Sequence, residues 1–321
     1  MKNIPRLKIA HLPTPVETLP RLSNALGGQK ILVKRDDMTG LAMGGNKIRK
    51  LEFLLAEAQA NGARTVITAG AVQSNHCRQT AAAAARFNFD CILVLSGEKP
   101  AAVSGNLLLD QLFGAEFVFT SLEKRGDVLQ QTFEKAWEQG RRPYLIPYGG
   151  SNTTGATAYV FAIQELLEQK CLPDWIVFAS SSAGTQAGLV VGANLFNFGG
   201  KILGISVDET KEILQTRVAD LANATADMLG EKVKFQPQDI LVCADYLGEG
   251  YGVMGKPEIE AIQLFAREEG LLLDPVYTGR AGAGLIDLIR KGFFKPDETV
   301  LFWHTGGIPA LFSEKYQQLA T

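Results

Sequence analysis

The chain has 321 residues, of which 46% are apolar and 21% charged, so it has the composition of a globular protein long enough for two domains. Its net charge of −2 gives no electrostatic reason to expect binding to nucleic acid or to an anionic membrane. No apolar run reaches about 18 residues, so we expect no membrane span. No apolar core comes directly after residues 1–6, so we expect no signal peptide.

Short apolar strands alternate with helices along the chain. The predicted strands cover residues 31–35, 65–69, 91–95, 116–119, 144–147, 175–179, 202–207 and 300–304. Helices are predicted from Asn46 to residues 61–62, over the alanine-rich segment 78–87, and over the polar segment 129–137. This alternation predicts βαβ units and an α/β fold with mainly parallel, twisted sheets. The glycine pairs at residues 44–45 and 149–150 are the only plausible internal seams.

Residues 44–50, Gly-Gly-Asn-Lys-Ile-Arg-Lys, place three cations in the first turn of the first predicted helix. Cations are unfavourable there by about a few tenths of a kcal/mol each, because a helix N-terminus carries a partial positive charge. A bound anion such as phosphate would relieve this, and so would a lysine joined as an imine to a cofactor aldehyde. A solvated basic helix start remains the alternative.

Four polar or glycine-rich segments follow predicted strands, where α/β sheets bind ligands. They are residues 70–76, 180–188, 274–280 and 304–309. Segment 180–188 suits a phosphate, since small residues expose backbone N–H groups at a helix start, although it matches neither a Walker loop nor a dinucleotide fingerprint. A helix cap in 70–76 and a tight turn in 180–188 are the plain alternatives, and each of the other two segments alone is more often a turn.

Cysteine and histidine usage points away from disulfides and metals. The four cysteines, Cys77, Cys91, Cys171 and Cys243, are widely spaced, so we expect reduced thiols and a cytoplasmic location. The three histidines have no partner at metal-ligand spacing, and a zinc site is therefore not expected. Lys47 and the four segments instead supply the parts of a pyridoxal phosphate site: an amine, a phosphate cradle, an aromatic ring and a hydroxyl.

The chain resembles the pyridoxal-phosphate enzymes of the tryptophan-synthase β fold (fold type II), and within them the D-cysteine desulfhydrase and 1-aminocyclopropane-1-carboxylate deaminase family. The resemblance covers essentially the whole chain, with ordered matches at residues 34–37, 44–47, 73–76, 183–185, 273–279 and 304–307. It implies a large cofactor-binding domain of residues 1–50 and 152–321, a small inserted domain of residues 51–151, and a homodimer.

The resemblance also implies a role for each matching residue. Lys47 would hold the cofactor as an internal aldimine and move protons, Ser74 would meet the substrate carboxylate or assist proton transfer, and Tyr277 would lie beside cofactor and substrate. The other cofactor-binding roles would be Asn75 on the ring hydroxyl, Lys50 with Ala183, Gly184 and Thr185 on the phosphate, and Thr305 on the pyridine nitrogen. Gln186 stands where relatives often have histidine, and we expect it to change the rim of the phosphate loop.

The reaction implied by this resemblance depends on the strength of the electron sink. Cyclopropane deaminases typically have glutamate after the tyrosine, whereas this chain has Thr278. A hydroxyl at the ring nitrogen leaves a weaker sink than a carboxylate does, which suits a substrate with a good leaving group. We therefore expect β-elimination of D-cysteine to sulfide, pyruvate and ammonia. Elimination from cysteate or β-chloro-amino acids, cyclopropane ring opening, and a binding module without turnover remain alternatives, although an intact lysine argues against the last.

Overall fold

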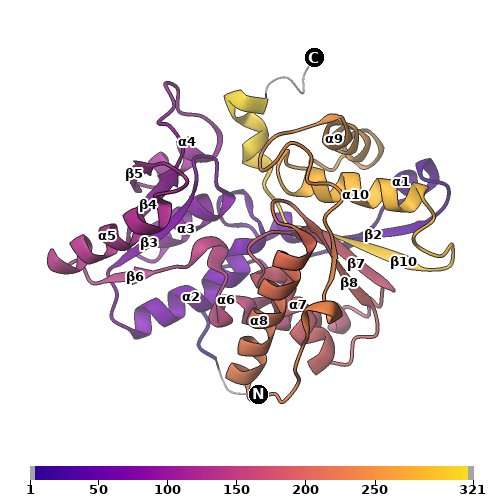
Figure 1. Ribbon diagram of the computed structural model, residues 1–321, viewed down its shortest axis with the longest axis horizontal. Coiled ribbons are helices and arrows are strands. Elements are labelled where there is room, and N and C mark those ends of the chain that lie inside the picture. Colours follow the sequence, from indigo (N-terminus) through magenta and orange to yellow (C-terminus); the bar gives the residue numbers. More distant parts are fainter. Residues whose placement is uncertain (1–3, 317–321) are drawn as a thin grey trace.

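Two sheets organise the chain, and the computed structural model describes them within residues 4–316 (Figure 1). The six-stranded sheet contains, in spatial order, β1 (Val16–Thr18), β2 (Lys30–Arg35), β10 (Thr299–His304), β7 (Trp175–Ser180), β8 (Lys201–Ser206) and β9 (Leu241–Cys243). All of its neighbouring strands are parallel except β1 and β2.

The second sheet is built from strands between residues 65 and 145 and is entirely parallel. Its four strands, in spatial order, are β5 (Glu116–Thr120), β4 (Asp90–Ser96), β3 (Thr65–Ala71) and β6 (Pro143–Leu145). The predicted α/β fold with mainly parallel sheets is thus confirmed. The strand predicted at 144–147 ends early, at Leu145, and the chain turns into the short 3-10 helix η3 (Tyr148–Gly150). Pro147 has no N–H group with which to continue the ladder.

Helices cover both faces of the six-stranded sheet. One face carries α1 (Pro20–Ala25), α9 (Lys256–Glu269) and α10 (Thr278–Arg290), and the other carries α6 (Thr153–Glu168) and α7 (Gly184–Leu195), with α8 (Lys211–Leu229) packed on α7. Successive side chains of β10 point to opposite faces of the sheet, as in any β-strand. Val300 and Phe302 pack with α9 and α10, whereas Leu301 and Trp303 pack with α6 and α7.

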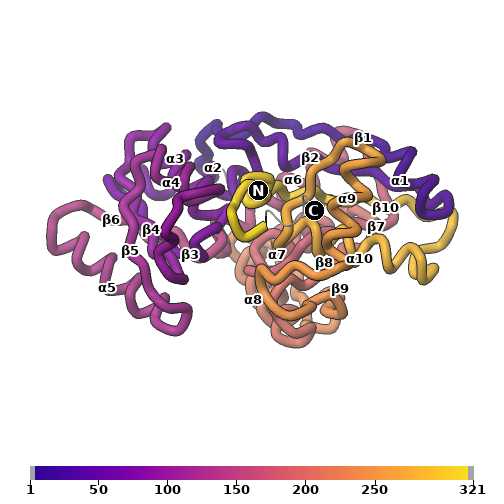
Figure 2. Tube along the Cα trace, turned by 90° about the horizontal axis from the view of Figure 1, so that it is seen from above, coloured from indigo at the N-terminus to yellow at the C-terminus, as the bar shows by residue number. Residues whose placement is uncertain are grey.

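The four-stranded sheet is covered in the same way. Helices α2 (Asn46–Ala60), α3 (Asn75–Arg86) and α4 (Gly105–Leu112) contribute to the core on one face, and α5 (Arg125–Glu138) lies on the other. Helix α2 also packs on α6, with Phe53 inside the core of the larger sheet. The two sheets therefore lie side by side with α2 in contact with both parts (Figure 2). The domain boundaries expected at residues 50 and 151 stay a prediction.

Two further features bear on the expectations from sequence. No helix in the part of the chain that the structure describes is long and apolar enough to cross a membrane. The cysteines at 77, 91, 171 and 243 are all free thiols, and three of them are buried.

Candidate active site

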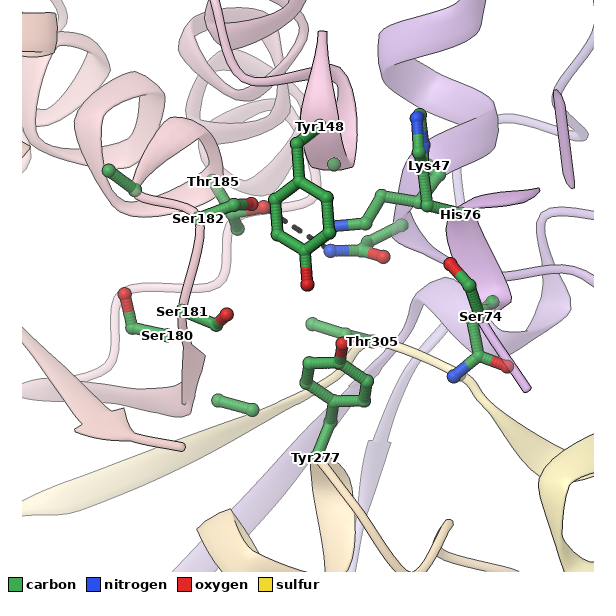
Figure 3. A pocket seen from close by; sticks show the side chains of 16 residues that line it. Lys47, Ser74, His76, Tyr148, Ser180, Ser181, Ser182, Thr185, Tyr277 and Thr305 are labelled. Atoms are coloured by element: carbon green, nitrogen blue, oxygen red, sulfur yellow. Dashed lines mark hydrogen bonds between the residues drawn. The ribbon is translucent and has the colours of Figure 1, made fainter. Parts of the chain in front are cut away.

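A pocket lies where the ends of β3, β7 and β10 approach the start of α2 (Figure 3). Its walls are mostly small, hydroxyl-bearing or amide side chains, and they come from both sheets. The lining residues are Asn46, Lys47, Ser74, Asn75, His76, Tyr148, Gly149, Ala179, Ser180, Ser181, Ser182, Ala183, Thr185, Tyr277, Thr305 and Gly306.

The structure brings the residues expected at the site together. The pocket is lined by Lys47, Ser74, Asn75, Ala183, Thr185, Tyr277 and Thr305. Lys50 and Gly184 do not line it but lie directly behind the wall, since a Cβ built on Gly184 would come within 2.9 Å of Lys50 Nζ. Segments separated by more than 200 residues thus converge on one cavity, at the edge of the sheets where α/β folds bind ligands.

Lys47 projects into the pocket from the first turn of α2. The backbone N–H of Asn46 donates to the carbonyl of Thr305 at 2.9 Å, and that of Ile48 donates to Oε1 of Gln79 at 3.0 Å. The helix start is therefore held from two sides. Burial lowers the pKa of Lys47 to about 8, against the opposing effects of the Asp208 charge and of a hydrogen bond with Lys50. About half of this amine is consequently neutral near pH 8.

Lys50 lies one turn further along α2 and is fully buried. Its Nζ donates to the carbonyl of Gly149 at 3.1 Å and to Oγ of Ser151 at 3.3 Å. Burial and the positive charge of Lys47 hold the pKa of Lys50 well below its usual value. None of the pocket-lining residues in the described part of the chain is a carboxylate. Two neighbouring amines without a lining carboxylate make this end of the pocket suited to an anion.

The turn into α7 forms the wall beside these amines. Ala183 adopts a left-handed conformation (φ 68°), so the chain turns sharply before the helix begins at Gly184. The N–H of Gly184 donates to Oγ of Ser151 at 3.2 Å, and Ser151 and Ser182 share a hydroxyl contact of 2.8 Å. The following N–H groups of the first helical turn have no partner within the helix, which is the arrangement that binds phosphate.

Ser74 and Asn75 occupy the start of α3. Ser74 caps the helix, because its Oγ accepts from the N–H of Cys77 at 3.2 Å. Oδ1 of Asn75 accepts from Arg78 Nη1 at 3.1 Å and from Asn106 Nδ2 at 2.9 Å. The amide nitrogen of Asn75 is then the atom left to face the pocket, so this wall offers a hydrogen-bond donor.

Three tyrosines gather at the pocket. The hydroxyls of Tyr277 and Tyr251 are 2.6 Å apart, and their rings meet edge to face with centroids 5.9 Å apart. Tyr148 faces the cavity across from Tyr277 (Figure 3) and carries Arg125 over its ring at 4.5 Å. Burial raises the pKa of Tyr277 and of Tyr251 well above the usual value, so both phenols stay protonated at neutral pH. Neither Tyr148 nor Tyr251 was expected at the site, because the short η3 and the turn in which they lie carry no recognisable motif.

The expectation for Gln186 changes, whereas Thr278, which was not expected among the site residues, lies outside the pocket. Gln186 does not alter the rim of the phosphate loop: it is fully buried, its Oε1 accepts from Oγ of Ser180 at 2.7 Å, and its Nε2 donates to the carbonyl of Leu241 at 2.8 Å. Thr278 does not line the pocket. The hydroxyl of Thr278 donates to Oδ1 of Asp274 at 2.8 Å and accepts from the backbone N–H of Asp274 at 2.7 Å. The lining hydroxyl at that end of the pocket belongs to Thr305.

Comparison with known proteins agrees with this geometry. Residues 7–306 match a family described as pyridoxal-phosphate dependent enzyme. The chain belongs to this family of pyridoxal-phosphate enzymes, and its fold is the tryptophan-synthase β-like fold.

Individual relatives extend over nearly the whole length. The chain is 44% identical over 322 residues to a D-cysteine desulfhydrase of Klebsiella pneumoniae (strain 342), covering 98% of this chain and 97% of the relative. It is 45% identical over 325 residues to a D-cysteine desulfhydrase of Salmonella choleraesuis (strain SC-B67), with the same shares. A crystal structure described as an ACC deaminase homologue matches with a TM-score of 0.90 at 39% identity, covering 98% of this chain and 96% of that one.

Proposed function

We propose that this protein is a D-cysteine desulfhydrase, which eliminates sulfide from D-cysteine and yields pyruvate and ammonia. The observation that carries the proposal is a pocket that combines Lys47 with hydroxyl and amide groups and that, within residues 4–316, has no lining carboxylate. Identity of 44% and 45% to two D-cysteine desulfhydrases supports the choice of substrate. The hand of the substrate rests on these relatives alone.

The residues present fit pyridoxal phosphate. Lys50 and the turn 183–185 are the groups suited to its phosphate, since they combine a buried amine with N–H groups of a helix start that have no partner within the helix. The amide nitrogen of Asn75 suits the ring hydroxyl, and the hydroxyl of Thr305 suits the ring nitrogen. When bound, the cofactor supplies an aldehyde for the substrate amine and a ring that withdraws electrons from the Cα–H bond.

Lys47 is the residue best suited to move protons at the substrate Cα. Its lowered pKa, about 8, leaves about a tenth of Nζ neutral at pH 7 and about half at pH 8, and this neutral amine can accept a proton. Ser74 has its hydroxyl at the helix start, where it can bind the substrate carboxylate. Tyr277 keeps its phenol protonated and can donate a hydrogen bond to the departing sulfur.

The chemistry at Thr305 favours elimination over ring opening. A hydroxyl at the ring nitrogen stabilises less negative charge than a glutamate-held proton would. Thiolate departs readily under those conditions, whereas a cyclopropane carbon does not. The second candidate is 1-aminocyclopropane-1-carboxylate deamination, which is favoured by the similarity to the ACC deaminase homologue.

Product assays on the purified holoenzyme test the proposal. We expect sulfide and pyruvate from D-cysteine, with slower release from L-cysteine and cysteate, and little 2-oxobutyrate from the cyclopropane acid. Faster opening of the cyclopropane ring than release of sulfide would replace the desulfhydrase by the deaminase. Absence of turnover with a normal visible cofactor band would favour a binding protein.

Three other expectations remain proposals. A homodimer is expected from the family resemblance, and the mass in solution from light scattering would test it. A cytoplasmic location is expected from reduced thiols. The division into a large domain (1–50 and 152–321) and a small domain (51–151) would be tested by limited proteolysis near the two seams.

A further inference from the structure

Arg78 is a buried cation directly behind the pocket wall. Its side chain is fully buried on α3, and it donates from Nη1 to Oδ1 of Asn75 at 3.1 Å and to Oδ1 of Asn106 at 2.9 Å. Its Nη2 donates to the carbonyl of Gly44 at 2.6 Å. One guanidinium therefore touches two segments that carry the site, the start of α3 and the loop before α2.

We propose that Arg78 is a positioning residue for the cofactor: it locks the amide of Asn75 with its N–H group toward the pocket and fixes the loop that precedes Lys47. The inference deepens the proposed function and rests on it, because it assumes that Asn75 and Lys47 meet the same cofactor. It concerns which atom of Asn75 faces the pocket and which residue decides this.

The orientation of the Asn75 amide follows from a chain of obligatory donors. Arg78 has only donors, so the Asn75 and Asn106 atoms that it contacts must be oxygens. The nitrogen of Asn106 then donates to the backbone carbonyl of Gln73 at 2.9 Å and to Oδ1 of Asn75 at 2.9 Å. Two donors, Arg78 itself and the Asn106 amide that Arg78 orients, thus converge on the same oxygen of Asn75. The pocket meets a donor at this point, which suits an anionic oxygen on the ligand.

The second contact of Arg78 controls the other wall. Gly44 lies three residues before Lys47, and the next residue of α3, Gln79, accepts the N–H of Ile48 at 3.0 Å. Arg78 and Gln79 therefore hold the chain on both sides of Lys47. Because a Cβ on Gly45 would come within 2.5 Å of Gln79, only glycine permits this approach. Arg78 and Gln79 together form a clamp on this segment, and the clamp sets the distance between the amine of Lys47 and the amide of Asn75.

The charge of Arg78 decides how the proposal is tested. The carboxyls of Asp110 on α4 and of Asp274 attract Arg78, and the two oxygens of Asp110 have no hydrogen-bond partner among residues 4–316. Removing Arg78 alone would leave the Asp110 carboxyl buried without the guanidinium that opposes the rise of its pKa. The double variant Arg78→Met with Asp110→Asn removes the guanidinium and the titratable carboxyl together and keeps most of the volume.

The experiment titrates pyridoxal phosphate into protein freed of cofactor by hydroxylamine and follows the visible band. Asn75→Asp keeps an oxygen for Arg78 but replaces the inward donor by an acceptor. We expect it to weaken cofactor binding about ten- to hundredfold. The double variant should weaken binding in the same range and shift the band, because the amide can then rotate. Arg86→Met, on the exposed end of the same helix, should match the wild type.

The outcomes separate the clamp from the proposed function. If Asn75→Asp binds the cofactor as tightly as the wild type, the assigned orientation is wrong. If the double variant folds, binds with wild-type affinity and keeps the wild-type band, Arg78 is not a positioning residue. If the wild-type protein binds the cofactor tightly but releases no sulfide from D-cysteine, the proposed desulfhydrase function is wrong. The positioning role of Arg78 is unaffected by that result. A variant with lysine at position 78 keeps the positive charge but loses the forked guanidinium. If Arg78→Lys keeps the wild-type band, the charge alone suffices and the specific hydrogen bonds of Arg78 do not position the cofactor.

Discussion

At the scale of single residues, Lys47 both lines the pocket and has a pKa lowered to about 8. Three cations crowd the start of α2, and two of them, Lys47 and Lys50, lie close enough for the charge of one to lower the pKa of the other. The third, Arg49, points away into a buried ion-pair network. The sequence pattern therefore marked a real electrostatic conflict, but only the structure separates the reactive amine from the structural cation.

Lys47→Ala should abolish turnover while the fold survives. The variant loses the only pocket-lining amine of the described chain, and we expect the rate with D-cysteine to fall at least about a thousandfold. Sulfide release measures the loss, and borohydride treatment followed by mass spectrometry shows whether cofactor is still trapped on the protein. Lys211→Ala, at an exposed helix start, is the matched control. Wild-type turnover in Lys47→Ala would remove this lysine from the mechanism.

At the scale of elements, two helix starts shape the pocket, and each tolerates little change. The turn into α7 requires a residue without a side chain at Gly184, since a Cβ there would come within 2.6 Å of Ser151 Oγ and 2.9 Å of Lys50 Nζ. Helix α3 requires Ser74 as its cap and buries Arg78 against α4. Both starts were placed by sequence reasoning, because a polar segment between a strand and a helix is a local pattern.

Gly184→Val should weaken cofactor binding. The added side chain pushes Ser151 and Lys50 out of the cradle, so we expect the dissociation constant of pyridoxal phosphate to rise about tenfold or more. Absorbance titration of the cofactor-free protein measures it. Gly199→Ala is the control, because nothing lies within 4 Å of a Cβ at that glycine. An unchanged dissociation constant in Gly184→Val would place the phosphate elsewhere.

Asp110→Asn should stabilise the protein as the pH rises. Burial raises the pKa of Asp110 to about 8, although Arg78 opposes the shift. Below about pH 4 the carboxyl is neutral in both folded and unfolded chains. Between there and pH 8 the unfolded chain ionises while the folded chain keeps its proton, so the wild type loses stability and the amide variant does not.

Chemical denaturation at several pH values measures this effect. We expect the advantage of Asp110→Asn in the free energy of unfolding to grow from pH 5 to pH 8 by about 1.4 kcal/mol per pH unit at most. Asp297→Asn, on an exposed turn, should show no such trend. A constant difference across this range would mean that Asp110 ionises normally in the folded protein.

At the scale of the whole molecule, the sequence predicted the fold class but not how its parts are joined. Eight strands were placed from apolar runs bounded by polar turns, whereas β1 and β9, of three residues each, were missed. The equally short β6 was found because its apolar run continues beyond the strand, through Ile146 and Pro147. Site residues near helix starts were likewise visible. Tyr148, Tyr251 and Arg78 were not, because their roles depend on contacts between segments far apart in the chain.

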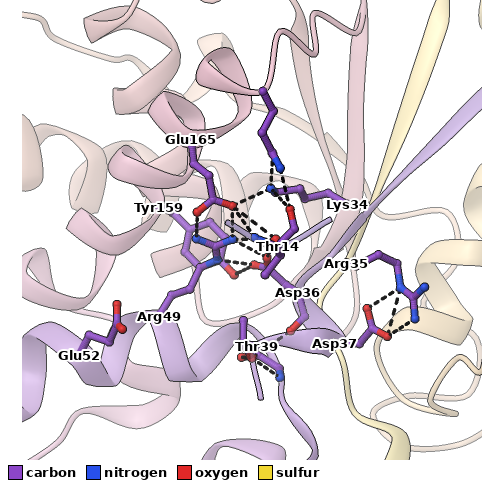
Figure 4. A network of polar contacts seen from close by, with 12 residues as sticks. Thr14, Lys34, Arg35, Asp36, Asp37, Thr39, Arg49, Glu52, Tyr159 and Glu165 are labelled. Atoms are coloured by element: carbon purple, nitrogen blue, oxygen red, sulfur yellow. Dashed lines mark hydrogen bonds and ion pairs between the residues drawn. The ribbon is translucent and has the colours of Figure 1, made fainter. Parts of the chain in front are cut away.

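The joint between the parts is a buried polar network (Figure 4). Arg49 of α2 donates to both oxygens of Asp36, which follows β2, and to both oxygens of Glu165 on α6. Lys34 of β2 also contacts Glu165, at 2.6 Å, and Tyr159 donates to Asp36 at 2.6 Å. The helix that carries Lys47 is thereby tied to the six-stranded sheet and to the helix layer beneath it.

Arg49→Met should destabilise the whole molecule. The variant leaves the buried Asp36 and the partly buried Glu165 without their main partner, and we expect a loss of about 3–5 kcal/mol in the free energy of unfolding at pH 7. Arg290→Met, which breaks the half-exposed pair with Glu260, should change stability by less than about 0.5 kcal/mol. Equilibrium denaturation of both variants against the wild type provides the comparison.

The same loss should depend on pH in a defined direction. Burial opposes ionisation of Asp36 and Glu165, but Arg49 outweighs it and lowers the pKa of both below the usual value. A carboxylate whose pKa is lowered in the folded state stabilises above its unfolded pKa, and this stability disappears as the pH falls through the folded value. The difference between wild type and Arg49→Met should therefore be full at pH 7 and shrink toward acid. A difference that stays constant on acidification would show that the two carboxyls are already protonated in the native network, and that α2 is held by packing on α6 rather than by its charges.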